Sequence, residues 1–278
     1  HGTQTVDDWY QATVSAACCG VTCVVDYPMQ KKGHSLRHIL NEWHEKAVNK
    51  AIIDYSFSPV IIDLTQEVYK EIPQLIKEGY PTFKVFMAYD FRVSDEEIIK
   101  LLDILSSNGG LLGIHAENDW AIGYLAQKML QEGKVEPRYH AISRPPVSEE
   151  EATSRVIKLA KMVNAHIFIV HLSEKGALKE VEAARSKGYP VYAETCPHFL
   201  VLDPGLYDLP ISEAAKYVVT PPLRTEEHRE ALWRGLAYGT IATVGSDHCA
   251  FPLSEKLRLG TGDFTKIPHG TPGIETRL

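Results

Sequence analysis

The feature that most constrains the fold is a regular alternation of short apolar segments with longer amphipathic ones. Segments rich in β-branched and aromatic residues are separated by segments whose apolar residues recur at helical spacing. We predict strands at 21–27, 53–61, 82–89, 111–117, 166–173, 190–196 and 240–248. Repeated strand–helix units indicate a parallel sheet covered by helices, because parallel strands need long crossover connections.

The segments between these strands predict helices, and two of them begin with a capping-box pattern. Ser94 precedes Glu97, and Ser148 precedes Glu151, at the spacing in which each side chain caps the other's backbone. The predicted helices are 5–20, 36–50, 65–79, one from 94, 119–133, 148–164, 174–188 and 225–239. We predict loop at 136–146 and 259–275, and irregular structure at 197–224.

This pattern favours a (β/α)₈ barrel of the TIM type. Seven strands are predicted and the chain opens on a helix, so we expect the first barrel strand to precede residue 1. We therefore expect residues 1–278 to form a single, incomplete barrel domain.

Composition limits the compartment and the partners. The net charge of −7 argues against nucleic-acid binding, and no apolar run approaches the length of a membrane helix. The five cysteines are odd in number and scattered, which is typical of a reducing compartment and of neither a disulfide framework nor a structural zinc site. We expect a cytoplasmic protein with no nucleic-acid or membrane partner.

Four polar side chains lie at or near the ends of predicted strands, where the chemistry of such barrels is found. They are Lys84, His115, His171 and Asp247. Each alone has an ordinary interpretation, as a structural histidine, a loop-capping aspartate or an edge lysine that reaches water. Two histidines and a carboxylate suit zinc or another first-row metal, and the four together indicate a site.

Lys84 is the unusual member, because it lies within the apolar segment PTFKVFMAYD (81–90). Burial disfavours the charged ammonium and promotes the neutral amine. A neutral amine can react with carbon dioxide to give a carbamate, whose two oxygen atoms can bridge two cations. We treat this carboxylated lysine as a hypothesis from the sequence.

Several ordered segments carry a family resemblance along essentially the whole chain. They are PTFKVFMAYD, LLGIHAEND, IFIVHLS, AETCPHFL, VVTPPLR, VGSDHCAF and DFTKIPHGTPGIETRL. Together they resemble the hydantoinase and dihydropyrimidinase family of the amidohydrolase superfamily. The spacings between the four polar residues, 31, 56 and 76 positions, agree with that family.

The resemblance implies a centre of two zinc ions bridged by carboxylated Lys84. His115 and His171 match the ligands of one metal, and Asp247 matches a ligand of the other that also moves the proton. Tyr89 matches the tyrosine that donates a hydrogen bond to the carbonyl oxygen under attack.

Two further residues match positions whose backbone holds the substrate ring. Thr220 stands where serine is usual, and His269 stands where many members have asparagine. Backbone contacts survive such changes, whereas substrate preference could shift.

The resemblance implies hydrolysis of the cyclic amide bond of hydantoins or dihydropyrimidines to N-carbamoyl amino acids, by a hydroxide held between the two metals. It also implies a homo-oligomer, a tetramer or a dimer. One alternative is an allantoinase-like cyclic amidase, although KVFMAY and IPHGTPGIE favour the hydantoinase branch. Another is a non-catalytic dihydropyrimidinase-related scaffold protein, which the presence of all four ligand residues argues against.

Two parts of the family pattern are absent from this chain. One is a His-x-His pair on the first barrel strand, expected just upstream of residue 1 and not replaced by His1; the other is a small flanking β-sandwich. We expect His166, His198 and His248 not to bind metal, because their strand positions or motifs suggest packing or support. Glu117 and Asn118 are expected to orient the loop around His115.

Overall fold

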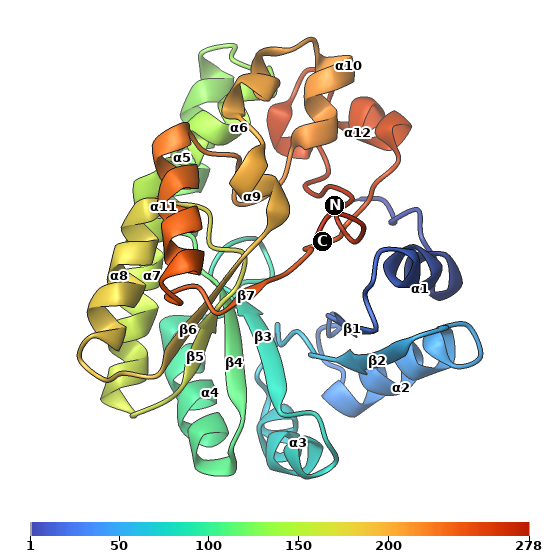
Figure 1. Ribbon diagram of the computed structural model, residues 1–278, viewed down its shortest axis with the longest axis vertical. Helices are drawn as coiled ribbons and strands as arrows, with labels where there is room; N and C mark the ends of the chain where they lie inside the picture. The colour runs from blue at the N-terminus through green and yellow to red at the C-terminus, as the bar shows by residue number, and fades with distance from the viewer. Residues whose placement is uncertain (1, 278) are drawn as a thin grey trace.

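The computed structural model describes residues 2–277, so His1 and Leu278 lie outside the described residues. Within this range a parallel sheet curves through the molecule, with helices packed outside it and further helices beyond one end (Figure 1). Its strands fall inside the predicted segments and are shorter than them. They are β1 Cys23–Asp26, β2 Asp54–Phe57, β3 Thr82–Phe86, β4 Leu111–His115, β5 Ile167–Ile169, β6 Val191–Thr195 and β7 Thr243–Val244.

Neighbouring strands in the chain are also neighbours in the sheet. β3 to β7 pair in chain order and in parallel, and β1 pairs in parallel with β2. Single parallel bridges from Met29 to Val60 and from Val60 to Lys84 join the two groups. Because all pairings are parallel, the carboxyl ends of the strands meet on one side of the sheet.

Helices follow the strands as the alternating pattern predicts. In Figure 1, α4, α7 and α8 lie along the outer side of β4–β6, whereas α6, α10 and α12 lie beyond one end of the sheet. The longer helices are α1 Trp9–Cys18, α2 Leu36–Ala47, α3 Gln66–Lys77, α4 Asp95–Asn108, α5 Asp119–Gln131, α7 Pro146–Met162, α8 Lys175–Arg185, α11 Glu226–Ala237 and α12 Leu253–Gly260. The shorter ones are α6 Arg138–Ser143, α9 Pro197–Val201, α10 Ile211–Ala214 and the 3₁₀ turns η1 Pro204–Asp208, η2 Ala215–Tyr217 and η3 Phe264–Lys266.

The core lies between the sheet and its covering helices. Strand side chains such as Phe83, Val85, Leu112, Ile114 and Ile167 are fully buried. Strands buried on both faces carry nearly continuous apolar runs, which explains why a polar residue in or after such a run is conspicuous.

The capping box predicted at Ser148 and Glu151 is wrong. Helix α7 begins at Pro146, with Pro145 as its N-cap, and Ser148 lies in the first turn. The Ser148 hydroxyl donates instead to the Pro145 carbonyl at 2.7 Å. Proline at the first helical position has its φ angle already fixed for a helix, so it starts the helix two residues earlier.

The capping box at Ser94 and Glu97 is confirmed, with both reciprocal hydrogen bonds present. The segment 136–146, predicted as loop, contains α6, and the segment 259–275 contains the short turn η3. The region 197–224 holds α9, η1, α10 and η2. These short helices lack the long periodic pattern that a sequence reading depends on.

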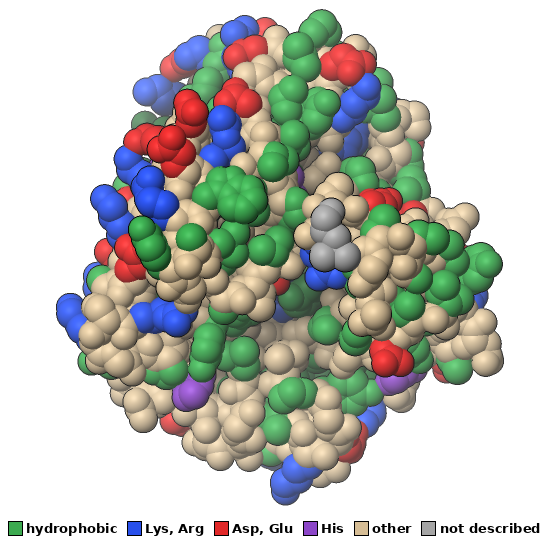
Figure 2. All heavy atoms as spheres, viewed as in Figure 1, with side chains coloured by type: hydrophobic (Ala, Val, Ile, Leu, Met, Phe, Trp, Pro, Cys, Tyr) green, Lys and Arg blue, Asp and Glu red, His purple; other side chains and the backbone are tan. Residues whose placement is uncertain are grey.

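Figure 2 shows the surface of the face seen in Figure 1. Lysine and arginine side chains alternate with acidic ones along the left edge, over α8 and α11, while hydrophobic side chains gather around α1 on the right. No helix within residues 2–277 is both long enough and apolar enough to span a bilayer.

Candidate metal centre

The sheet brings the four predicted ligand residues to one region. His115 is the last residue of β4, Lys84 lies in β3, and His171 and Asp247 lie just beyond β5 and β7. Lys84, His115 and His171 are buried, and Asp247 is half-buried. Electrostatic interaction of Lys84 and His171 with Asp247 follows from this proximity.

The two histidines face one another. Nδ1 of His115 lies 2.9 Å from Nε2 of His171, and their ring centres are 4.6 Å apart. The other nitrogen of His115, Nε2, lies 2.7 Å from Oε2 of Glu117. Glu117 is fully buried and also pairs with Arg144, whose Nη1 atom lies 2.7 Å from Oε2 of Glu117. Glu117 therefore holds His115 in one orientation; the sequence predicted a supporting role for Glu117, in orienting the loop around His115.

This pair of nitrogens fits a first-row metal. Metal–nitrogen bonds of about 2.0–2.1 Å at a tetrahedral angle place two ligand nitrogens about 3.3 Å apart, so a few tenths of an ångström separate the pair from that spacing. A carboxylate partner on the far nitrogen of His115 is typical of a metal-bound imidazole. No group of three or more His, Cys, Asp or Glu side chains able to hold a metal ion is found within residues 2–277.

Lys84 has the environment of a neutral amine. Burial lowers the pKa of Lys84, and the carboxylates of Asp247 and Glu194 oppose this effect. Its Nζ atom lies 4.2 Å from the ring centre of Tyr27 and 4.9 Å from that of Phe86. Among the salt bridges formed by residues 2–277, none involves Lys84, so aromatic faces rather than a paired carboxylate surround the amine.

Asp247 is held as a carboxylate. Burial opposes its ionisation, but electrostatic interactions with His171 and Lys84 outweigh burial and keep its pKa below the usual value. Glu194 of β6, which sequence analysis missed, behaves oppositely: burial and the Asp247 charge raise its pKa to about 7. A charged residue inside the strand segment VYAETC was the available signal.

The backbone is unusual at three of the predicted site residues. Among residues 2–277, positive φ angles outside glycine occur at Tyr89 (77°), His171 (40°), Asp247 (44°), Asn49 and Asn164. Asparagine, aspartate and histidine enter this region more often than other residue types, whereas the bulky Tyr89 adopts it at a cost. Such conformations persist where the surrounding structure enforces them, and they cluster at functional sites.

The three predicted substrate-binding residues also come together. Nδ1 of His269 lies 2.9 Å from the Thr220 hydroxyl oxygen and 3.4 Å from that of Tyr89. The Tyr89 backbone N–H donates to Asp119 at 2.8 Å, which fixes the loop after β3. Burial raises the pKa of Tyr89, so its phenol remains a donor at neutral pH.

His140, which sequence analysis missed, lies beside this group. Its ring centre is 4.5 Å from that of His269, and its Nε2 donates to the Val219 carbonyl at 2.9 Å. Burial, followed by the nearby Arg144 charge, lowers the pKa of His140 to about 3. The segment around His140 was predicted as loop, so neither its burial nor its partners could be read from the sequence.

His248 has partners other than the metal centre. Its Nε2 lies 2.8 Å from Asp7, and its Nδ1 accepts the backbone N–H groups of Gly273 and Ile274 at 3.0 and 3.2 Å. His248 thereby ties the strand end to both terminal segments.

His166 and His198, also expected not to bind metal, differ in burial. His166 is exposed, with its ring centre 6.3 Å from that of Tyr192. His198 is buried; burial lowers its pKa to about 4, and Asp247 opposes that shift.

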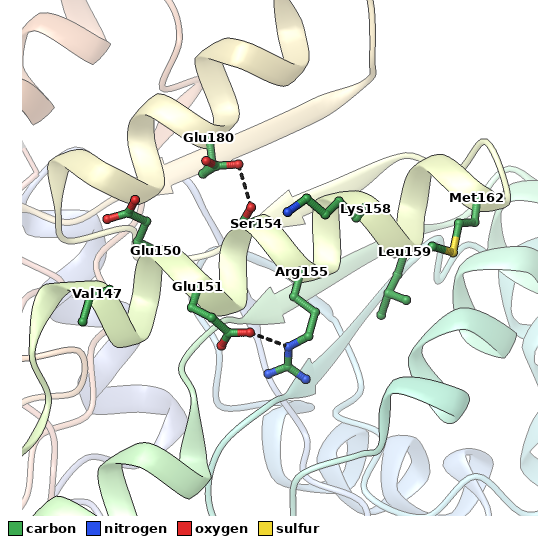
Figure 3. Close-up of a pocket in the computed structure, with 9 residues that line it drawn as sticks. All are labelled: Val147, Glu150, Glu151, Ser154, Arg155, Lys158, Leu159, Met162 and Glu180. Carbon is green, nitrogen blue, oxygen red and sulfur yellow. Dashed lines mark hydrogen bonds and ion pairs between the residues drawn. The ribbon is translucent and has the colours of Figure 1, made fainter.

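Two surface hollows lie apart from these residues. One, of about 520 Å³, lies over α7 and α8, where Ser154 donates to Glu180 and Arg155 pairs with Glu151 (Figure 3). The other, of about 680 Å³, lies beside the first turns of α4 and α5. None of the predicted site residues lines either hollow.

The parallel sheet, with lysine, histidine and aspartate side chains in and just beyond its strands, defines the class of fold, a TIM-type barrel. The chain is 43% identical to a D-hydantoinase of Geobacillus stearothermophilus over 280 residues, covering 100% of this chain and 59% of that protein. The chain belongs to the hydantoinase and dihydropyrimidinase family.

Solved structures agree with this family and with the predicted barrel fold. The dihydropyrimidinase of Brevibacillus agri NCHU1002 matches with a TM-score of 0.97 and 43% identity, over 99% of this chain and 60% of that one. The D-hydantoinase of Bacillus sp. AR9 matches with a TM-score of 0.97 and 45% identity, over 100% and 62%. No protein-family model matches the chain. The chain spans about 60% of the length of these relatives.

Proposed function

We propose that the intact protein is a metal-dependent cyclic amidohydrolase that opens a hydantoin or dihydropyrimidine ring to an N-carbamoyl amino acid. The observation that carries the proposal is the facing pair of nitrogens on His115 and His171, beside the buried Lys84 amine and the Asp247 carboxylate. The hydantoinase and dihydropyrimidinase names of the relatives support the substrate class. Nothing favours the allantoinase or the scaffold alternative.

The proposed cofactor is a pair of zinc ions bridged by carboxylated Lys84. His115 and His171 would hold one ion and Asp247 the other. The neutral amine that burial favours at Lys84 is the form that reacts with carbon dioxide. When bound, the metals would supply an acidified water and polarise the substrate carbonyl.

The chain's own residues would then move one proton and stabilise one charge. Tyr89 donates its phenol hydrogen to the ring carbonyl oxygen as that oxygen gains negative charge. Asp247, a carboxylate at neutral pH, takes the proton from the attacking water and returns it to the ring nitrogen when the C–N bond breaks. The backbones of Thr220 and His269 hold the ring.

The remaining parts of the proposal concern the whole protein. Residues 1–278 would form one incomplete barrel domain, and the intact protein would form a homo-oligomer, a tetramer or a dimer, as the family resemblance implies. A cytoplasmic location is supported by the five cysteines, all of which are free in the described structure.

The test is Lys84→Ala in the full-length protein, compared with Lys100→Ala, whose side chain forms an exposed ion pair with Glu96. We expect Lys84→Ala to lose bound zinc and turnover on a panel of hydantoin, dihydropyrimidine and allantoin, while the control keeps both. Unchanged zinc content and turnover in Lys84→Ala would remove the bridging role. A wild-type protein that hydrolyses allantoin but neither hydantoin nor dihydropyrimidine would contradict the proposed substrate class.

A further inference from the structure

Lys256 is a second buried lysine, remote in sequence from the metal-ligand candidates. It lies in α12 and is only 2% exposed. Its Nζ atom donates to three backbone carbonyls, those of Ala215 at 3.0 Å, Val218 at 3.2 Å and Gly270 at 2.5 Å. An ammonium has three N–H donors, so these carbonyls use its full capacity.

The three carbonyls belong to two segments that are far apart in the chain, one with Ala215 and Val218 and the other with Gly270. Val218 lies two residues before Thr220, and Gly270 directly follows His269. The Gly270 N–H also donates to the Val218 carbonyl at 2.9 Å. One ammonium and one backbone hydrogen bond thus join the segment carrying Thr220 to the segment carrying His269.

The buried Lys256 ammonium needs partners that compensate its charge. Burying an ammonium costs free energy that only hydrogen bonds or opposite charges offset. Among the ion pairs of residues 2–277, none includes Lys256, so the carbonyls alone compensate its charge. Hydrogen bonds from a charged donor are roughly twice as strong as neutral ones, which suits a fixed joint between two loops.

We propose that Lys256 is a positioning residue whose ammonium fixes the Thr220 and His269 segments relative to each other, so that both face one substrate ring. This inference rests on the proposed function, in which those two segments bind the ring. The Nζ atom of Lys256 donates to backbone carbonyls and not to the metal-ligand side chains, so we expect its effect to fall on substrate binding rather than on the chemical step.

The test uses the full-length, metal-loaded protein with Lys256→Met, Lys256→Arg and the control Lys266→Met. Lys266 lies nearby in η3 with an exposed side chain paired to Asp263. We expect Lys256→Met to raise KM about tenfold, as expected for losing charge-assisted hydrogen bonds, with kcat within about twofold and bound metal unchanged. Lys256→Arg should have a KM close to that of the wild type, because arginine restores a cationic donor.

A second readout does not depend on turnover. Hydrogen exchange of segments 216–221 and 268–272 should accelerate together in Lys256→Met and stay at the wild-type rate in Lys266→Met. Should the methionine variant fail to fold, Lys256→Gln, which keeps two donors, is compared in the same way.

Unchanged KM and unchanged exchange of both segments would overturn the inference. So would a fall in kcat or bound metal at constant KM, because that pattern places the effect at the metal centre. A wild-type protein that opens no cyclic ureide would overturn the proposed function, whereas the exchange comparison would still decide whether Lys256 couples the two segments.

Discussion

Nδ1 of His115 lies 2.9 Å from Nε2 of His171, and the two imidazoles are held with unequal firmness. The far nitrogen of His115 is bonded to Glu117, which is itself bonded to Arg144. The far nitrogen of His171, Nδ1, is buried and has no hydrogen-bond partner within residues 2–277. Orientation of the pair therefore depends on the Glu117 side.

Glu117→Gln should weaken metal binding in the full-length protein. The amide keeps the shape of the carboxylate but loses the charge that orients His115 and raises its basicity. We expect metal affinity to fall roughly 10- to 100-fold, the usual effect of losing such a partner. Competition with a chelator measures the affinity, and Glu96→Gln, an exposed glutamate of α4, is the matched control. Equal affinities for both variants would contradict the orienting role.

Arg144→Met should destabilise the fold strongly. It removes the guanidinium that compensates the fully buried Glu117 carboxylate, and an uncompensated buried charge costs about 3–5 kcal/mol. Arg155→Met is the control, because Arg155 pairs with Asp95 and Glu151 at the surface, where such pairs contribute about 1 kcal/mol or less. Urea unfolding compares the two, and similar free energies of unfolding would refute the difference.

The strands, and the polar side chains that gather near their ends, were predictable because their signals are local. Strands buried on both faces give continuous apolar runs, so Lys84 and His171 stand out against Phe83 and Ile169. Parallel topology then brings the strand ends together without further information.

Apart from Glu117, the residues that support the site were not predictable, because their roles depend on tertiary contacts. His140 and Arg144 come from a segment predicted as loop, and Lys256 owes its role to carbonyls from two other segments. Glu194 differs, since it carried the same signal as Lys84, a charge inside a strand segment. The misplaced cap at Ser148 shows a competing local signal, the proline pair before it, that determined where α7 begins.

His140 should make the protein acid-sensitive below about pH 6.5. Its pKa is about 3 in the folded protein, against about 6.5 when unfolded, so between these values the unfolded chain binds the extra proton. Stability from neutral His140 is therefore complete above pH 6.5 and is lost as pH falls, by about 2 kcal/mol at pH 5. His140→Gln, which keeps a donor for the Val219 carbonyl, should lose stability less steeply between pH 7.5 and 5. If the free energy of unfolding falls equally steeply with pH in the two proteins, His140 is not the source of the acid sensitivity.

Replacement by alanine should stabilise the fold at one glycine and destabilise it at another. In Gly123→Ala, within α5, the added methyl meets no atom within 4 Å, so lower chain entropy in the unfolded state should stabilise the fold by about 0.5–1 kcal/mol. In Gly270→Ala, the methyl would lie 2.3 Å from the Cys249 carbonyl oxygen. Relieving that overlap must move backbone, which should cost about 1–3 kcal/mol.

The same shift should displace the neighbouring His269, so Gly270→Ala should also raise KM for the ring substrate while bound metal stays constant. Thermal unfolding and steady-state kinetics on the full-length variants measure both effects. A Gly270→Ala protein as stable as Gly123→Ala would mean that the 270 segment is free to move away from Cys249, which its hydrogen bonds to Val218 and Lys256 argue against.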